Sequence, residues 1–387
     1  MKIVHLCLGN FFSDNYSYQE NMLSKFHKQM GYDIEVVASL FTFDQNGKGI
    51  YRKETSTYFN ENNVLITRLA YKNPFKVYRK LKRYVGAYTA LEKAAPDILF
   101  IHGCQFMDMD IVVKYLSVHK NVKVYVDNHA DFSNSATNIL SKNILHRIVW
   151  RHAAKIIEPY TEKFYGVLPA RVDFLKNMYH LPAEKVELLV MGADDDKIFE
   201  AKEGRAREVI RGKYGIKPDE FLVMTGGKID EWKTQTLLLM KAVGKIQNEK
   251  IKLIVFGSVI PELIQKVNEL ADGKKVQYIG WIASDLSYNY WSAADLAVFP
   301  GRHSVFWEQV AGMGIPMICK YWDGTTHIDV GGNVIFLKQD SVEEIQSILQ
   351  YLLANPGEYQ KMLDVACGKG KEKFSYKEIS RKAIQME

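Results

Sequence analysis

Short apolar runs alternate with helical patterns along nearly the whole chain, and polar loops separate them. The run Lys2–Leu8 has the length of a buried strand, whereas Tyr18–Met30 has the spacing of an amphipathic helix. Strands that alternate with helices form βαβ units, so this half predicts a parallel sheet. Its other predicted strands are Asp33–Ser39, Val64–Leu69, Asp97–His102, Val122–Val126, Lys155–Glu158 and Val186–Met191, with a largely helical segment over Thr161–Tyr179.

A second series of strands and helices begins after a junction predicted at Gly192–Phe199. It opens with a charged helix over Lys202–Tyr214, and a last helical pattern begins at Tyr376. The pattern predicts two α/β domains, residues 1–191 and 192–369, followed by a C-terminal segment, 370–387. Two such domains on a short linker leave a cleft where a ligand would bind. The strands predicted here are Phe221–Thr225, Lys252–Phe256, Val276–Ile279, Leu296–Phe299, one from Met317, and Ile335–Leu337.

Length and composition agree with two ordinary globular domains. The chain of 387 residues exceeds a single hydrophobic core, and 47% hydrophobic with 25% charged residues is typical of a soluble protein. The four cysteines lie far apart, which indicates neither a disulfide framework nor a zinc site and favours a reducing cytoplasm. The first apolar run is too short for a signal peptide, and no run reaches the roughly 18 residues of a transmembrane helix.

One strand–loop–helix–strand unit carries the richest candidate chemistry. Residues 295–318 read DLAVFPGRHSVFWEQVAGMGIPMI, in which a buried strand ends at Pro300 and a helix from Val305 ends at Gly314. The loop follows the carboxyl end of its strand, where open α/β sheets bind ligands. Free N–H groups and the dipole at the helix N-terminus favour a phosphate there.

Several segments, taken in order, resemble the retaining family-four glycosyltransferases of the GT-B fold. KVELLVMGADDDKIF resembles the domain junction of that family, MTGGKIDEWKTQTLLLMKAV its diphosphate-binding segment, and LSYNYWSAADLAVFP the approach to its donor loop. DILFIHG and YVDNHADF resemble the amino-domain strands that end near the acceptor. The resemblance implies two Rossmann-like domains that face each other across a cleft, with a C-terminal helix that crosses back to the first domain. It also implies a nucleotide diphosphate-sugar donor and no metal or other cofactor.

In the family, two basic side chains hold the donor diphosphate, and the matching positions here are Lys228 and Lys233. They follow a strand, and Gly227 allows the backbone to approach a ligand closely. An enzyme without a metal needs protein cations to neutralise a diphosphate leaving group. The competing interpretation is that these lysines are ordinary solvated charges of a loop.

The donor loop departs from the family, which usually has two glutamates eight positions apart. Alignment on Gly314 and Pro316 puts Gln309 at the second position, with Glu308 one step before it. Glutamine can still bond ribose hydroxyls, because its amide both donates and accepts. The other donor-binding candidates are Arg302, His303, Ser304 and the backbone N–H of Val305. A divergent loop that has altered or lost donor binding is the alternative.

Candidates on the acceptor side follow three strands of the first half. The resemblance implies that His129, in a polar turn beside Asp131, approaches the donor sugar and supports departure of the diphosphate. Gly9 and Asn10 follow the first strand and are expected to face the cleft; His102 is either a cleft residue or a core histidine. The run Asp194–Asp196 is better interpreted as a hinge turn with a helix cap than as a metal site.

The segment Lys72–Tyr88 carries six basic residues and no acid, interleaved with aromatic and aliphatic side chains. Such a helix suits an anionic membrane surface, although an amphipathic helix packed on the sheet fits equally well. No recognised nucleic-acid module is present. The expected protein is a cytoplasmic enzyme, with peripheral membrane contact as an option, that transfers a sugar to a glycan or lipid-linked acceptor in surface polysaccharide biosynthesis. The alternatives are a non-catalytic GT-B subunit that binds a glycan or partner enzyme, and a sugar-nucleotide epimerase of the same fold.

Overall fold

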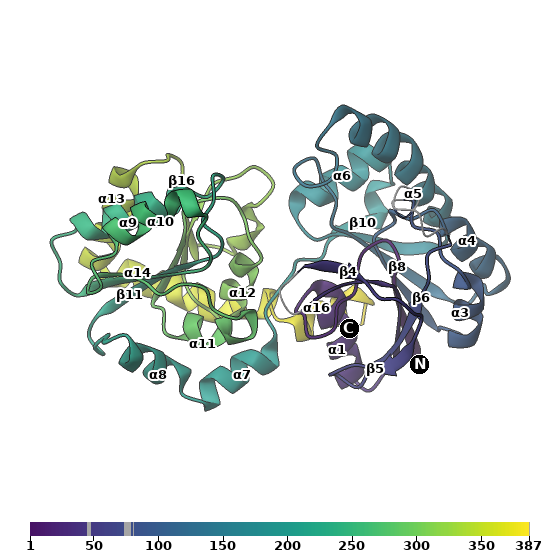
Figure 1. Cartoon of the computed structure of the whole chain (residues 1–387), viewed down its shortest axis with the longest axis horizontal. Helices are drawn as coiled ribbons and strands as arrows, with labels where there is room; N and C mark the ends of the chain where they lie inside the picture. The colour runs from purple at the N-terminus through teal and green to yellow at the C-terminus, as the bar shows by residue number, and fades with distance from the viewer. Residues whose placement is uncertain (45–47, 73–78, 80, 387) are drawn as a thin grey trace. The chain divides into compact units, whose positions relative to one another are not determined.

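The computed structural model describes residues 1–44, 48–72, 79 and 81–386, and the chain forms two compact units (Figure 1). Unit 1 contains residues 1–190 and 379–387, and unit 2 contains residues 191–378. Each unit has a largely parallel sheet with helices packed against it, so the predicted α/β class is confirmed.

The sheet of unit 1 has the strand order β10-β9-β8-β7-β1-β2-β6-β5, and all neighbours pair in parallel except β5 and β6. A separate antiparallel hairpin joins β3 and β4. The strands are β1 (Lys2–Cys7), β2 (Asp33–Ser39), β3 (Phe41–Phe43), β4 (Gly49–Tyr51), β5 (Thr57–Phe59), β6 (Leu65–Leu69), β7 (Ile98–His102), β8 (Lys123–Asn128), β9 (Thr161–Gly166) and β10 (Val186–Leu188).

A large apolar cluster, including Leu99, Val126 and Phe164, lies between the sheet of unit 1 and its helices. The prediction over residues 155–179 was partly wrong: Lys155–Glu158 ends a helix, and Thr161–Gly166 is the strand. Buried and exposed residues do not alternate regularly in this strand, and a helix follows it at Pro169. The period of a strand was therefore not recognisable in the sequence. The helices of unit 1 are α1 (Gln19–Gln29), α3 (Ala87–Ala94), α4 (Met109–Val118), the π-helix η1 (Ser141–Trp150), α5 (Arg151–Ile157), η2 (Glu158–Tyr160), α6 (Pro169–Tyr179) and η3 (Ala183–Lys185).

Unit 2 has a fully parallel sheet in the order β13-β12-β11-β14-β15-β16. The helix predicted over Lys202–Tyr214 is instead two helices, because the chain turns at Arg205, whose φ is +49°. Asp194 caps the first of them by accepting from the N–H of Asp196, as the sequence indicated. The strands are β11 (Phe221–Gly226), β12 (Ile251–Phe256), β13 (Val276–Tyr278), β14 (Leu296–Phe299), β15 (Met317–Lys320) and β16 (Val334–Leu337).

The helices of unit 2 cover both faces of its sheet (Figure 1). They are α7 (Asp195–Glu203), α8 (Ala206–Lys213), α9 (Gln235–Lys245), α10 (Pro261–Leu270), η4 (Ser284–Leu286), α11 (Ser287–Ser292), α12 (Phe306–Gly312), η5 (Thr326–Ile328), α13 (Val342–Ala354), α14 (Pro356–Val365), η6 (Ala366–Gly370) and α15 (Lys371–Lys373). The last helix, α16 (Tyr376–Ala383), begins in unit 2, and its residues from Ile379 onward belong to unit 1.

Each sheet has one point at which the chain reverses the direction of strand addition. In unit 1, β1 leads to β2 on one side, and β7 then pairs with β1 on the other. In unit 2, β11 leads to β12, and β14 later pairs with β11 on the other side. In open α/β sheets, ligands bind at the carboxyl ends of the two strands that flank such a point.

Candidate functional site

The loops that follow β11 and β12 in unit 2 approach so closely that glycine is required. A Cβ on Gly226 would lie 2.3 Å from the ring of Phe256, and a Cβ on Gly257 would lie 1.9 Å from the carbonyl oxygen of Gly227. Gly227 has a φ of +124°, which side-chain-bearing residues rarely adopt. Gly227, which the sequence predicted to bring the backbone near a ligand, therefore shapes the carboxyl edge of this sheet together with Gly226 and Gly257.

Both predicted diphosphate-binding lysines lie on the loop after β11. Lys228 is exposed, and its Nζ lies 3.6 Å from a carboxylate oxygen of Asp230. Lys233 is half-buried, and burial lowers its pKa. The carboxylate of Asp230 acts in the opposite direction, and the charge of Lys228 lowers the pKa further. The Nζ of Lys233 lies 3.9 Å from the position of a Cβ on Gly227. The glycine turn thus lies directly beneath the ammonium group.

The loop after β14 lies beside the lysine loop, although about 70 residues separate them in sequence. A Cβ on Gly301 would lie 3.6 Å from Cα of Lys233. The guanidinium of Arg302 lies 4.5 Å from the centre of the Trp232 ring, a cation–π contact. The structure therefore brings three cations, Lys228, Lys233 and Arg302, to the reversal point of the sheet in unit 2.

Glu308, on α12, is completely buried and is held by two histidines. The Nε2 atoms of His303 and His327 lie 2.7 and 2.9 Å from the same oxygen, Oε1. Burial alone would raise the pKa of Glu308, but the charge and hydrogen bonds of His303, with those of His327, outweigh it and hold the pKa well below its usual range. His327 follows β15 and was not singled out from the sequence.

The same three side chains, His303, Glu308 and His327, could hold a metal ion, because one ligand atom of each lies within 4.8 Å of the others. Imidazole nitrogens with one carboxylate oxygen are ligands that suit Zn²⁺. The short contacts are also those of two N–H groups that donate to one carboxylate, which needs no metal. In either case Glu308 links the loop after β14, at His303, to the segment after β15.

The remaining donor candidates occupy the start of α12. Gln309 is buried, and its amide donates to Oγ of Ser287 at 2.8 Å. The carbonyl oxygen of Ser304 accepts from the N–H of Trp307, and Val305 is exposed at the position before the helix. Ser304 and Val305 lie in the loop itself, whereas the side chain of Gln309 already has a partner within the unit.

In unit 1, the loops after β1 and β7 touch at the reversal point. The backbone N–H of Asn10 donates to the carbonyl oxygen of His102 at 3.1 Å. A Cβ on Gly9 would lie 2.1 Å from the carbonyl oxygen of Gly103, which explains the glycine. Asn10 also donates to Glu20 at 2.8 Å, and the Nζ of Lys82 donates to the carbonyl of Gly9. Burial lowers the pKa of Lys82 to about 8.

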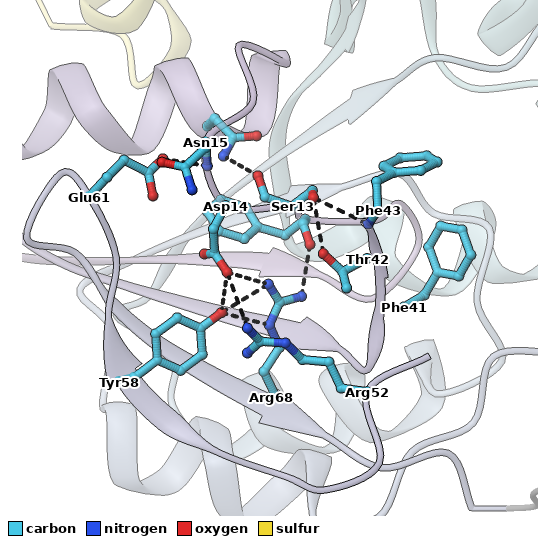
Figure 2. Close-up of polar contacts among 12 residues, drawn as sticks. Ser13, Asp14, Asn15, Phe41, Thr42, Phe43, Arg52, Tyr58, Glu61 and Arg68 are labelled. Atoms are coloured by element: carbon cyan, nitrogen blue, oxygen red, sulfur yellow. Dashed lines mark hydrogen bonds and ion pairs between the residues drawn. The ribbon is translucent and has the colours of Figure 1, made fainter. Parts of the chain in front are cut away.

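A buried arginine fixes the rest of the loop after β1, as Figure 2 shows. Arg68, on β6, donates to the carbonyl oxygens of Phe12 at 2.8 Å and Ser39 at 3.1 Å. Its side chain also contacts Asp14 at 3.5 Å and the hydroxyl of Tyr58 at 3.1 Å, and Tyr58 donates to Asp14 at 2.6 Å. These bonds give residues 12–14 a defined path, and nothing in the spacing around Arg68 marked it in the sequence.

In the structure, His129 lies beside the carboxylate of Asp127, on β8, and Asp131 has other partners. Nε2 of His129 lies 3.6 Å from Oδ2 of Asp127. Asp131 instead accepts from the backbone N–H of Ser133 at 2.7 Å and pairs with Arg171 at 3.2 Å. Burial lowers the pKa of His129, but the Asp127 carboxylate outweighs burial and raises it. His129 and Asp131, which the sequence places in the same turn, therefore have different charged partners in the structure.

His102 lies in the core, which is one of its two predicted positions, and has no exposed surface. The basic segment Lys72–Tyr88 falls partly on residues 73–78 and 80, which lie outside the described residues. Among the helices that the structure describes, none has the length and apolar character needed to cross a membrane.

No protein-family model matches the sequence. Mannosylfructose-phosphate synthase from Agrobacterium fabrum is 20% identical over 233 residues, which is 56% of this chain. The match covers 51% of that synthase, so the chain matches about half the length of this relative.

Solved structures match nearly the whole chain. Anabaena Alr3699/HepE in complex with UDP is 14% identical with a TM-score of 0.66, over 100% of this chain and 99% of HepE. WaaG, a glycosyltransferase involved in lipopolysaccharide biosynthesis, is 15% identical with a TM-score of 0.62, over 99% and 98%. UDP-GlcNAc 2-epimerase from Neisseria meningitidis is 12% identical with a TM-score of 0.61, over 100% and 99%. The chain therefore has the GT-B fold, as its sequence motifs implied.

Proposed function

We propose that this protein is a retaining, metal-independent glycosyltransferase of the family-four type. It would transfer a sugar from a nucleotide diphosphate-sugar to a glycan or a lipid-linked glycan in surface polysaccharide biosynthesis. The names of HepE with UDP and of WaaG support a nucleotide-sugar donor and a glycan product. The synthase relative makes sugar phosphates a further acceptor class to test.

The observation that carries the proposal is the group of three cations, Lys228, Lys233 and Arg302, at the reversal point of unit 2. A diphosphate leaving group develops negative charge as the glycosidic C–O bond breaks, and fixed cations stabilise that charge. Burial lowers the pKa of Lys233 because it disfavours the charged ammonium form. An anionic ligand beside Lys233 would stabilise that charged form. Trp232, beneath Arg302, holds the guanidinium in place.

In the proposed reaction, the bond between the anomeric carbon and the diphosphate oxygen breaks on the face where the acceptor hydroxyl attacks. The new bond forms between the anomeric carbon and the acceptor oxygen, and the acceptor proton moves to the leaving diphosphate. His129, whose pKa Asp127 raises against the effect of burial, would support the leaving group as an imidazolium. No protein nucleophile is required.

The deciding experiment measures transfer by the purified chain from UDP-sugars and other nucleotide sugars, with glycans, lipid-linked glycans and sugar phosphates as acceptors. We expect a glycoside with the anomeric configuration of the donor, and full activity in excess chelator. Loss of activity in chelator that added Zn²⁺, Mg²⁺ or Mn²⁺ restores would contradict metal independence. His303, Glu308 and His327 would then be the first metal site to examine.

The likeness to UDP-GlcNAc 2-epimerase favours one alternative, a sugar-nucleotide epimerase. That enzyme class would convert the nucleotide sugar without an acceptor, so product analysis with no acceptor present distinguishes the two. Nucleotide binding without transfer, hydrolysis or epimerisation would instead support a non-catalytic subunit that binds a glycan or partner enzyme. Peripheral membrane contact through Lys72–Tyr88 remains part of the proposal for a lipid-linked acceptor.

A further inference from the structure

A continuous row of hydrogen bonds crosses the interior of unit 1 from Asp127 to α16. Oδ2 of Asp127 lies 2.6 Å from Nδ1 of His102, and Nε2 of His102 lies 2.9 Å from Nδ1 of His5. Nε2 of His5 lies 3.1 Å from Nδ1 of His27, and Nε2 of His27 lies 2.8 Å from the carbonyl oxygen of Ser380. All four side chains are completely buried.

The two ends of this row are both hydrogen-bond acceptors. An ionised carboxylate and a backbone carbonyl can only accept, so each needs an N–H from the imidazole beside it. The row has four contacts, and each contact needs one proton. Three neutral imidazoles carry one N–H each and supply only three protons. One more proton must therefore reside on the row if all four hydrogen bonds are made.

The surroundings decide where the additional proton resides. Asp127 has the contacts of a carboxylate, because Oδ1 accepts from the N–H of Gly103 and ring nitrogens of both His102 and His129 face Oδ2. Burial raises the pKa of Asp127, but these two histidines outweigh burial and lower it. Burial lowers the pKa of His27 to about 4, and burial with the charges of His27 and His102 holds that of His5 well below its usual range. These two rings are neutral, and His102 is the ring that contacts a carboxylate.

We propose that His102 is a buried imidazolium ion, paired with Asp127, and that it orients every proton of the row toward α16. His102 donates from Nδ1 to Asp127 and from Nε2 to His5. His5 and His27 are then neutral and carry their proton on Nε2. The last N–H meets the carbonyl of Ser380, one of the four terminal carbonyls of α16 that lack a partner within the helix.

Two consequences follow for unit 1. Asp127 is a positioning residue, because its negative charge is compensated inside the core and acts on His129 from 3.6 Å. The protonation state of the row is also linked to the docking of the chain end, because a row of three neutral rings must lose one of its four bonds. Other ionisable groups that interact with the row are Cys7 and Cys104, near Asp127, and Tyr32, whose ring contacts His27. Glu20, Lys82 and Arg171 interact in turn with Cys7, Cys104 or His129. This proposal does not depend on the transfer activity.

Nitrogen-15 NMR of the full-length protein, labelled in histidine, reads the protonation of each ring nitrogen directly. Near neutral pH, we expect His102 to carry protons on both nitrogens and His5 and His27 to carry one each, on Nε2. A neutral His102 in the folded wild-type protein would overturn the proposal. Single histidine substitutions supply the assignments.

Two variants of His27 form a matched pair. In His27→Gln, the amide can donate to Ser380 and its oxygen can accept from His5, so the row still ends on two acceptors and His102 should remain charged. In His27→Leu, two bonds disappear, and two neutral rings suffice for the remaining two; His102 should then become neutral. The same charge state of His102 in both variants would overturn the proposal.

If His27→Leu does not fold, Asp127→Asn tests the charge of His102 instead. The Asn amide can donate to Nδ1 of His102 while its oxygen accepts from the N–H of Gly103, as Asp127 does at 3.1 Å. The row then has a donor at one end, and three neutral rings satisfy it. We expect His102 to be neutral with its proton on Nε2; a doubly protonated His102 in this variant would refute the proton count.

Discussion

At the scale of single residues, charge compensation decides which side chains can remain ionised inside this protein. Arg68 has no exposed side-chain surface, and carbonyl oxygens, a hydroxyl and Asp14 surround its guanidinium. Glu308 is equally buried, and two imidazoles contact one of its oxygens. Removal of one partner from such a group leaves an uncompensated buried charge, which costs several kcal/mol.

The cations of unit 2 provide the first prediction. Lys228→Ala and Lys233→Ala should each weaken the binding of a nucleoside diphosphate at least about tenfold, because a charge-assisted hydrogen bond contributes roughly 1.5–3 kcal/mol. Isothermal titration calorimetry with UDP measures this effect. Lys241→Ala, an exposed change on α9, is the control and should bind as the wild type does. Unchanged affinity in both test variants would remove these lysines from the site.

The second prediction concerns the pH dependence of stability. The pKa of Glu308 is lower in the folded protein than in the unfolded chain, so its stabilising effect is complete above about pH 4.3 and is lost as the pH falls further. Glu308→Gln should lower the melting temperature at pH 7 and reduce its decline between pH 5 and 3. Glu203→Gln, an exposed change at the end of α7, should leave the whole profile unchanged. Parallel profiles for Glu308→Gln and wild type would contradict the assigned charge.

At the scale of elements, close approach of the loops after neighbouring strands shapes the carboxyl edge of each sheet. The loops after β1 and β7 touch at Gly9 and Gly103, and those after β11 and β12 touch at Gly227 and Gly257. A methyl group on Gly9 or on Gly257 would meet backbone atoms of the other loop, which cannot move away as a flexible side chain can. Glycine at these positions is therefore a packing requirement of the sheet edge.

Gly9→Ala tests that requirement in unit 1. The new Cβ would lie 2.1 Å from the carbonyl oxygen of Gly103, so the two loops must separate. We expect destabilisation of about 1–3 kcal/mol, as overpacking costs, seen as a lower midpoint of urea unfolding. Gly212→Ala in α8, with nothing within 4 Å of its Cβ, should instead stabilise by about 0.5–1 kcal/mol. Equal midpoints for the two variants would show that the loops separate freely.

At the scale of the whole molecule, the chain end completes the fold of unit 1. The carbonyl oxygens of Lys382 and Ile384 accept from the hydroxyls of Tyr165 and Tyr125, each at 3.2 Å, and Ile379, Ala383 and Ile384 are buried. An isolated helix as short as α16 is marginal in water, so these contacts are what stabilise it. The segment that is last in the sequence is thus part of the first unit's core.

Deletion of residues after Phe374 should therefore lower the melting temperature by several degrees, because it exposes the apolar surface beneath α16 and leaves His27 without its acceptor. The double change Tyr125→Phe and Tyr165→Phe removes only the two hydroxyl bonds and should cost about 1 kcal/mol for each. Differential scanning calorimetry compares the three proteins. A truncated protein that melts with the wild type would show that the end of the chain is frayed.

Local patterns in the sequence determined most of the elements and the position of the candidate loops. Apolar runs such as Leu296–Phe299 mark buried strands, and their ends place Gly9, Lys228 and Arg302 at the carboxyl edges of the sheets. These predictions succeed because period and turn chemistry depend on neighbours within a few residues. They failed at Thr161–Gly166, where the aromatic pattern of a strand lies beside a long helix.

Tertiary structure alone decided which polar groups meet. His5 and His102 are 97 residues apart, and His27 and Ser380 are 353 apart, yet all four belong to one row because β1 pairs with β7 and α16 returns beside α1. His129 likewise lies beside Asp127 and not Asp131. Strand order and the return of the chain end determine these partners. Neither leaves a periodic signal in the sequence, because the partner of a buried polar side chain lies far away along the chain.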